Sequence, residues 1–211
     1  MTVMLIKNIK GWYRAFCTPC AIVFFMLGGI MRIFVIGGQA KTGKNTFGEF
    51  LKEELKDYSY KPCVMHITEP LYSYARNYFQ WDGSEDNKPR EFLQKMGIEI
   101  IREKMGKKDF LLNRLYDDIE ILNNFFDTFI IVDARLIHEF EDIKNHFDDV
   151  VTIKLERKNY DAMLSDEEAQ HVTEMEINNY SDFDYIIENR SLDDLKNAAI
   201  EVIRNEENYG G

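Results

Sequence analysis

The sequence has few cysteines, few prolines and too few basic residues to balance its acidic ones. Its 211 residues include 3 Cys and 4 Pro, and 26 Lys and Arg against 37 Asp and Glu give a formal net charge of −11. A field of that sign repels nucleic-acid phosphates and anionic lipids, so the charge disfavours a protein that binds nucleic acid or a membrane surface. Three cysteines cannot form a disulfide framework, which favours a reduced, cytoplasmic location.

Two further features that would define a protein class are missing. Cys17 and Cys20 form a single CxxC pair with no second pair and no nearby His, which disfavours a zinc site. The apolar run at residues 21–31 ends at Arg32 and is too short for a membrane span. What is present is a folding composition, 45% hydrophobic and 30% charged, at a length that suits one compact domain.

The first thirty residues differ from the rest in charge. They contain Lys7, Lys10 and Arg14 and no acidic residue; removing three of the 26 basic residues leaves 23 against 37, or −14, for residues 31–211. We therefore divide the chain into an N-terminal extension, 1–30, and a domain, 31–211. The favoured interpretation is translation from Met31, with an upstream reading-frame extension before it. A hydrophobic N-terminal helix or secretory signal stays open as the alternative.

From Met31 onward, strand and helix signals alternate, which predicts an α/β domain with a mainly parallel sheet. Apolar runs predict strands at 33–36, 63–67, 129–132, 151–155 and 185–187. Apolar residues at helical spacing predict helices between them; one expected face carries Leu93, Met96 and Ile100. Ser191 and Asp194 form a capping-box-like start for a last helix, and residues 205–211 are expected to fray.

A glycine-rich motif carries the strongest chemical signal. It fits G-x-x-x-x-G-K, directly after a strand and before an amphipathic helix, and comprises Gly38, Gln39, Ala40, Lys41, Thr42, Gly43 and Lys44. The glycines let backbone N–H groups close around phosphate oxygens, and the helix N-terminus adds its positive end. Lys44 supplies a charge to the β- and γ-phosphates, so the motif predicts a nucleotide-binding P-loop.

The end of the motif departs from the usual pattern. Asn45 occupies the Ser/Thr place, and the hydroxyl follows one residue later at Thr46. A G-K-x-T ending resembles adenylate kinase and related small-molecule kinases, in which magnesium is held largely through phosphates and water. The resemblance implies Mg²⁺ as the cofactor and leaves its protein ligands open.

Several segments together resemble the deoxynucleoside monophosphate kinases of the adenylate-kinase-like P-loop group found in phages and bacteria. The likeness covers almost everything after Met31. Its segments are Gly43-Lys44-Asn45-Thr46, Asp133-Ala134-Arg135 with Glu139, Glu156-Arg157, His171-Val172-Thr173-Glu174, and Ile187-Glu188-Asn189 with Ser191. The resemblance implies a three-layer P-loop NTPase fold, with a mainly parallel sheet flanked by helices, a helical substrate-binding insertion and a short lid over 156–173.

The resemblance also implies roles for individual residues. ATP binding falls to residues 38–46 and Asn189, catalysis to Lys44, Asp133 and Arg157, and the metal to Thr46 and Asp133 through water. Substrate binding falls to Arg90, Gln94, Arg102 and Arg135.

The residues alone leave alternatives for three of these side chains. Asp133 ends a buried strand, where an unpaired carboxylate is costly, and a metal-linked or substrate-positioning role is favoured over helix capping. Arg135 fits phosphate binding and a structural ion pair equally. Arg157 fits the neutralisation of a transferred phosphoryl group or a solvated position in a polar loop.

The sequence thus predicts an enzyme that transfers the γ-phosphoryl group of ATP to a nucleoside monophosphate, most readily a deoxynucleotide. Its partners would be ATP and the acceptor. We expect no binding to nucleic acid, and no binding of residues 31–211 to a membrane. A homodimer is left open. Two alternatives remain. One is a P-loop kinase of another small phosphorylated metabolite, and the other is a non-catalytic ATP-binding regulatory protein.

Overall fold

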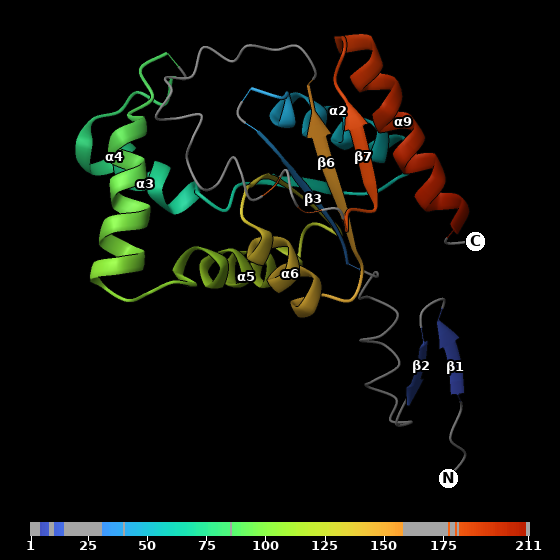
Figure 1. The fold of residues 1–211 in the computed structure, drawn as a ribbon. Coiled ribbons are helices and arrows are strands. Elements are labelled where there is room, and N and C mark those ends of the chain that lie inside the picture. The colour runs from blue at the N-terminus through green and yellow to red at the C-terminus, as the bar shows by residue number, and fades with distance from the viewer. Residues whose placement is uncertain are drawn as a thin grey trace.

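The computed structural model describes residues 5–8, 11–14, 31–39, 41–84, 86–157, 177, 180 and 182–209 (Figure 1). They contain two sheets. The smaller is an antiparallel pair of β1 (Leu5–Asn8) and β2 (Gly11–Arg14) within the N-terminal extension. The larger has five strands, all from residues 32–188.

The five-stranded sheet has the order β4-β5-β3-β6-β7, and every neighbouring pair is parallel. Its strands are β3 (Arg32–Gly38), β4 (Pro62–Met65), β5 (Thr128–Ala134), β6 (Val150–Glu156) and β7 (Tyr185–Glu188). Because all five run the same way, their carboxyl ends meet at one edge, where α/β sheets bind their ligands. The predicted parallel sheet is confirmed, although β4 ends at Met65, two residues earlier than expected.

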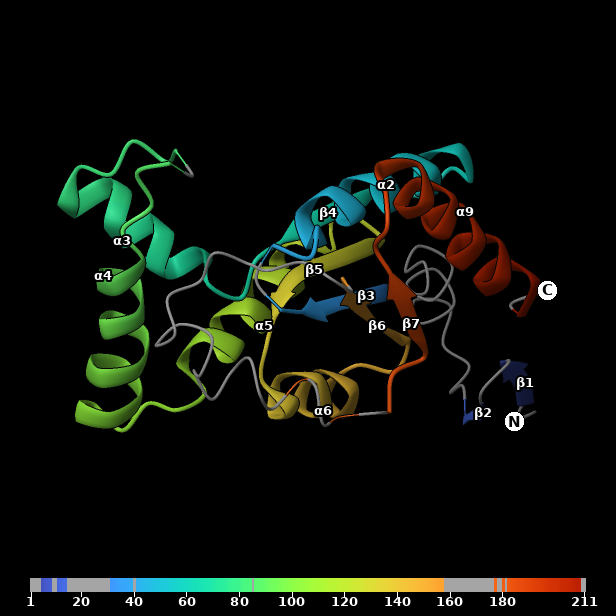
Figure 2. The same ribbon diagram turned by 45° about the horizontal axis from the view of Figure 1, so that its top comes forward.

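Helices cover both faces of this sheet (Figure 2). The described helices are α2 (Lys44–Asp57), α3 (Glu69–Phe79), α4 (Arg90–Gln94), the π-helix η1 (Lys95–Lys104), α5 (Phe110–Leu122), α6 (Ile137–His146) and α9 (Leu192–Tyr209). Helices α2 and α9 share one hydrophobic core with the sheet, and α5 and α6 share the other. This is the predicted three-layer α/β architecture.

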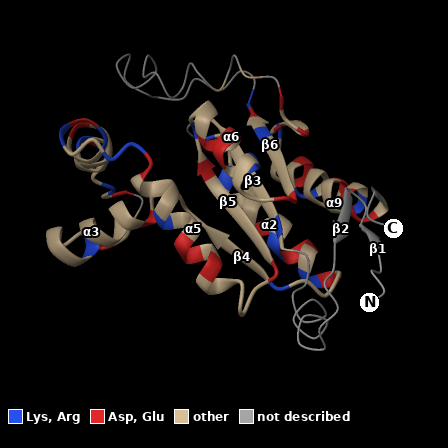
Figure 3. Ribbon diagram, turned by 90° about the horizontal axis from the view of Figure 1, so that it is seen from below, with Lys and Arg blue, Asp and Glu red and all other residues tan. Residues whose placement is uncertain are grey.

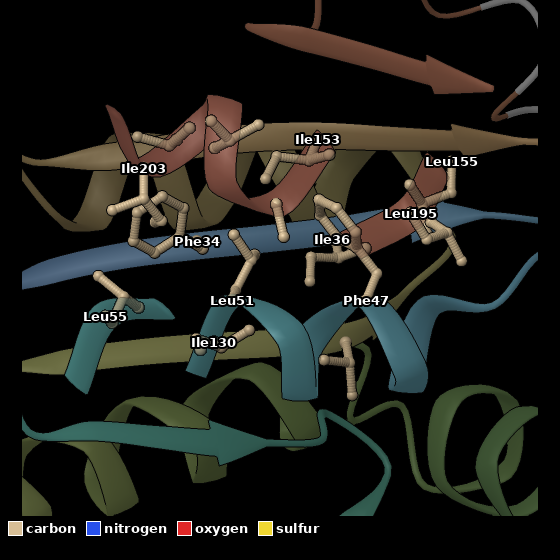
Figure 4. Packing of buried hydrophobic residues seen from close by; sticks show 14 residues of the cluster. Phe34, Ile36, Phe47, Leu51, Leu55, Ile130, Ile153, Leu155, Leu195 and Ile203 are labelled. Atoms are coloured by element: carbon tan, nitrogen blue, oxygen red, sulfur yellow. The ribbon is translucent and has the colours of Figure 1, made fainter. Parts of the chain in front are cut away.

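Successive side chains of β3 point to opposite faces of the sheet and so contribute to both hydrophobic cores. Phe34 and Ile36 point toward α2 and pack among Phe47 and Leu51 (Figure 4), while Ile33 on the same strand belongs to the opposite core. All five side chains are fully buried. Complete burial of such a side chain stabilises a fold by about 1.5–3 kcal/mol, so the two cores hold the end of β3 rigidly in the middle of the sheet.

A helical arm formed by α3, α4 and η1 lies to one side of the sheet (Figures 1 and 2). It has a small core of its own, made of Leu71, Ala75, Leu93 and Ile101. The prediction of a helical insertion is confirmed, but the expected face is wrong in one place. Ile101 is buried and Ile100 is 39% exposed, because the i→i+5 bonding of η1 places more residues in each turn than an α-helix does.

The last helix is longer than the sequence predicted. The expected fraying from residue 205 is wrong, since α9 continues to Tyr209. Polar contacts hold this end: Glu206 accepts a hydrogen bond from the Tyr185 hydroxyl, and Glu207 accepts one from the Tyr60 hydroxyl, each at 2.8 Å. The predicted start of the helix is confirmed by the bond from the Asp194 N–H to Ser191 Oγ, at 3.1 Å.

Two of our sequence predictions fall mainly outside the described residues. The proposed lid is described only at Glu156 and Arg157, and the apolar run at residues 21–31 only at Met31. None of the described helices has the length and apolar composition that a membrane crossing requires.

We expect removal of residues 1–30 to leave the domain folded. All strands of the five-stranded sheet and both of its hydrophobic cores come from residues 31–203. Far-UV circular dichroism and the thermal midpoint should match those of the full chain to within a few degrees, and solubility should rise as apolar surface is removed. A chain from Met31 that fails to fold would show that the extension belongs to the domain.

Candidate functional site

The P-loop joins the end of β3 to the start of α2, at the carboxyl edge of the sheet. Gly38 and Gly43 have φ values of 143° and 96°, which favour glycine. A Cβ at Gly38 would lie 2.3 Å from the Leu155 carbonyl oxygen, and one at Gly43 would lie 2.8 Å from Asn189 Nδ2. Neither position has room for a side chain, so the chain takes this path only with glycine at both.

Lys44 is held inside the loop by backbone carbonyl groups. Its side chain is buried, and its Nζ donates to the carbonyl oxygens of Gly38, at 2.8 Å, and Gln39, at 2.6 Å. The Thr42 hydroxyl also donates to the Gln39 carbonyl, at 2.9 Å. The ammonium group of Lys44 is therefore already placed at the mouth of the loop, where phosphate oxygens can replace the carbonyl contacts.

The first turn of α2 offers a site for an anion. The first N–H groups of a helix have no intrahelical partner, and they carry the positive end of the helix dipole. No acidic residue lies in this turn, and Asn45 and Thr46 are exposed in it. The chain is acidic overall, and Figure 3 shows many of its Asp and Glu residues along α5, α6 and α9. The loop itself contributes Lys41 and Lys44; Ala40 lies outside the described residues.

Asp133 lies near the end of β5, the neighbour of β3. Its Oδ1 accepts from the Ile67 N–H at 2.7 Å, and its Oδ2 accepts from the Thr68 N–H at 3.1 Å and from the Thr68 hydroxyl. Asp133 thus fixes the turn that leads from β4 into α3. A carboxylate can accept about four hydrogen bonds, so these three leave capacity for a water molecule.

Arg135 and Glu139 follow Asp133 at the same edge. The Glu139 carboxylate accepts from the backbone N–H groups of Arg135, at 2.8 Å, and Leu136, at 3.0 Å. These bonds satisfy two donors at the start of α6 and fix the backbone that presents Arg135. Glu139 was noted only as part of a resemblance, and the structure gives it a definite role in shaping this edge.

Burial raises the pKa of the Glu139 carboxyl from its ordinary 4.5 to about 7. The charge of Asp133 acts in the same direction, and the two backbone hydrogen bonds and the charge of Arg135 oppose it. Between pH 4.5 and 7 the folded chain therefore holds a proton that the unfolded chain releases. Glu139 consequently makes the free energy of unfolding fall as the pH rises through this window.

We expect Glu139→Gln to remove this pH dependence, because the amide oxygen still accepts the backbone bonds but does not ionise. The free energy of unfolding of the wild type, relative to the variant, should fall by on the order of 3 kcal/mol between pH 4.5 and pH 8. Urea denaturation at several pH values measures it. A difference that stays constant with pH would contradict the role of Glu139.

Arg157 and Asn189 come from the other side of β3. Arg157 is exposed directly after β6, which pairs with β3, and so lies at the same edge as the P-loop. Asn189 is buried after β7, and its Nδ2 donates to the Thr42 carbonyl at 2.8 Å. A buried Lys154, which the sequence did not single out, pairs with Glu156 at 2.8 Å beside Arg157.

The three predicted substrate residues on the helical arm lie at different depths. Arg90 and Gln94 are exposed on α4, and Arg102 is half-buried on η1. None of them belongs to the elements that form the P-loop edge. Their assignment to the acceptor therefore stays a prediction.

The sequence did not predict that aromatic and basic side chains gather around α3 of the arm. Tyr72 makes edge contacts with His66 and Trp81, at ring-centroid distances of 6.1 and 5.7 Å. Lys88 Nζ lies 4.8 Å from the Tyr72 ring centroid, and the Arg76 guanidinium lies 5.8 Å from that of Trp81. We call these five residues the aromatic wall. Their irregular spacing along the chain carries no periodic signal.

The residues fit a magnesium ion that is held mainly by a nucleotide. Within the described part of the chain, no cluster of three or more His, Cys, Asp or Glu could hold a metal by itself. Thr46 is exposed in the first turn of α2, and Asp133 keeps part of its acceptor capacity. Both side chains could bind such an ion through water, whereas the described residues contain no metal site made of protein ligands alone.

No protein-family model and no curated protein matches the sequence. Among solved structures, a shikimate kinase from Bacteroides thetaiotaomicron is 13% identical, with 84% of this chain and 99% of that chain covered and a TM-score of 0.49. A mutant APS kinase from Mycobacterium tuberculosis is 12% identical, with coverage of 83% and 99% and a TM-score of 0.47. A gluconokinase from Sinorhizobium meliloti is 9% identical, with coverage of 85% and 96% and a TM-score of 0.40. The likeness at this level adds nothing on substrate or activity.

Proposed function

We propose that the protein transfers the γ-phosphoryl group of ATP to a nucleoside monophosphate, giving the diphosphate. One observation carries the proposal: a glycine-dependent loop between a central parallel strand and a helix holds a buried lysine against its own carbonyl groups. Loops of this construction bind the β- and γ-phosphates of nucleotides. The helix start beside it is free of acidic residues, as an anion site requires.

The groups needed for the transfer are distributed around this loop. Lys44 would bind the β- and γ-phosphates, and the N–H groups at the start of α2 would surround them. Arg157 directly follows β6 and Arg135 directly follows β5, the two strands that flank β3. These arginines would neutralise the transferred group and the acceptor phosphate. Thr46 and Asp133 would hold Mg²⁺ through water, and the ion would offset the negative charge of the phosphates. The acceptor phosphate is already ionised, so no catalytic base is needed.

The aromatic wall supports a nucleotide as the acceptor. Asp133 binds the Ile67 and Thr68 N–H groups, which places the start of α3 beside the P-loop edge. His66, Tyr72 and Trp81 are half-buried and would offer the rest of their ring surfaces to a planar base, and Lys88 would offer a charge for its phosphate. Base stacking on aromatic side chains contributes about 1–3 kcal/mol per base.

We expect Tyr72→Leu to weaken binding of the acceptor and to leave binding of ATP unchanged. Loss of one stacking ring should raise the KM for the nucleoside monophosphate about 5- to 100-fold, with the KM for ATP unchanged. Tyr78→Leu is the matched control, because Tyr78 lies on the same helix and is 75% exposed. Equal KM values for the acceptor in both variants would show that the aromatic wall does not bind the acceptor.

Two other functions remain as rivals, a P-loop kinase of a different phosphorylated metabolite and an ATP-binding regulator without turnover. Measurement of ADP release from ATP, with nucleoside monophosphates and with non-nucleotide phosphates as acceptors, separates them. Release that depends on a nucleoside monophosphate supports the proposal. Release only with non-nucleotides supports the metabolite kinase, and tight ATP binding without acceptor-dependent release supports the regulator.

A further inference from the structure

Asn189 occupies a junction between three segments that are distant in sequence. It follows β7, precedes α9 and is 8% exposed. Its side-chain Nδ2 donates to the Thr42 carbonyl of the P-loop at 2.8 Å, and its backbone N–H donates to the Glu156 carbonyl at the end of β6 at 2.7 Å. The buried side chain is thus tied to the P-loop, and the backbone of the same residue is tied to the end of β6.

From these contacts we infer that Asn189 is a positioning residue, which fixes the P-loop and ties it to the strand end that presents Arg157, and does not recognise the adenine base. The inference rests on the proposed function. It extends that function by assigning a role to Asn189, which lies outside the loop.

The loop needs an outside donor at this place. Its carbonyl groups at Gly38 and Gln39 are bound by Lys44 and Thr42 from within the loop. The Thr42 carbonyl is bound by Asn189, 147 residues further along the chain. A phosphate-binding loop has to turn its carbonyl oxygens away from the anion and its N–H groups toward it. The Asn189 amide stabilises that orientation at Thr42, the residue before the helix cap.

Shape and hydrogen bonding both select asparagine at this position. The amide packs directly on Gly43, where a Cβ would come within 2.8 Å of Nδ2. An aspartate of the same shape would bring a carboxylate oxygen against the Thr42 carbonyl, and would add a negative charge beside the phosphates. An alanine would leave the buried carbonyl without its donor, which costs about as much as a lost hydrogen bond with desolvation.

The backbone hydrogen bond of Asn189 is made to Glu156, the residue immediately before Arg157. Glu156 accepts the Asn189 N–H through its carbonyl and an ion pair from the buried Lys154 through its side chain. The residue before Arg157 is therefore anchored twice. Through Asn189, this anchored strand end and the P-loop keep a fixed separation, which phosphoryl transfer requires of groups on opposite sides of the γ-phosphate.

The test compares Asn189→Ala with Arg190→Ala, its exposed neighbour, which pairs with Glu188. We expect Asn189→Ala to weaken binding of inorganic triphosphate and of ATP by the same factor, about tenfold, and Arg190→Ala to change neither. In the free protein, amide hydrogen exchange of residues 41–47 should become about tenfold faster in Asn189→Ala only. In a double-mutant cycle, Asn189→Ala should lower kcat less when Arg157 is already alanine.

Each other outcome has a definite meaning. Weaker ATP binding with unchanged triphosphate binding would make Asn189 a base contact and overturn the inference, as would unchanged exchange. Faster exchange in a protein whose wild type binds no triphosphate would uphold the positioning role and refute the proposed function instead. Should Asn189→Ala not fold, Asn189→Asp keeps the shape without the donor, and its exchange should accelerate in the same way.

Discussion

Lys44→Ala is expected to abolish phosphoryl transfer, with a loss in kcat/KM of at least about 10²- to 10³-fold. The Nζ of Lys44 is the buried cation at the mouth of the loop, and it needs only to exchange the Gly38 and Gln39 carbonyl oxygens for phosphate oxygens. Because those two bonds exist in the free protein, the variant should also lose about 1 kcal/mol of stability. Steady-state kinetics and urea denaturation measure the two effects separately.

The matched control is Lys56→Ala, on the same helix. Lys56 is exposed and pairs with Glu53 at 2.7 Å, so its removal should leave kinetics unchanged. Asn45→Ala should have a far smaller effect than Lys44→Ala, since the Thr46 hydroxyl remains. A Lys44→Ala enzyme that turns over at the wild-type rate would refute the P-loop assignment.

Arg157→Ala is expected to lower kcat by about 10²- to 10³-fold, while the affinity for ATP changes only a few-fold. Arg157 follows β6, beside β3 in the sheet, and is therefore placed at the loop without forming part of it. A cation in this position matters most when charge spreads over the transferred group, and it matters less in the ground state.

Arg204→Ala provides the comparison, since Arg204 is an exposed arginine on α9. It should leave both parameters unchanged. Normal turnover in Arg157→Ala, or an equal loss in kcat and ATP affinity, would move the role to another basic residue, and Lys158 is the neighbour to test next.

The sequence predicted the sheet well because the apolar runs of its buried strands can be recognised without knowledge of their neighbours. The continuous apolar run at 129–132 has no polar face, and it became the buried strand β5 between two neighbours. The position of the glycine-rich loop between β3 and α2 was predicted for a related reason, since the glycines and Lys44 act locally and at fixed spacing. Such signals do not depend on distant parts of the chain.

The rest of the site depends on contacts between distant residues. Asp133 binds backbone N–H groups about 66 residues away, and Asn189 binds a carbonyl 147 residues away, so neither partner follows from a pattern. The same holds for the end of α9, where tyrosine hydroxyls from β7 and the α2–β4 connection bind glutamates that looked like a polar tail. The π-helix was missed because its apolar spacing imitates an α-helix up to Met96.

The central claim is tested most directly by following the γ-phosphoryl group itself. Wild-type protein, Mg²⁺ and γ-labelled ATP are incubated with each nucleoside monophosphate in turn, and the labelled products are separated. We predict that label moves to at least one nucleoside monophosphate to give its diphosphate, and that this transfer is lost in Lys44→Ala and kept in Lys56→Ala. Label that reaches only water, or that stays on ATP with every nucleotide acceptor, would contradict the account.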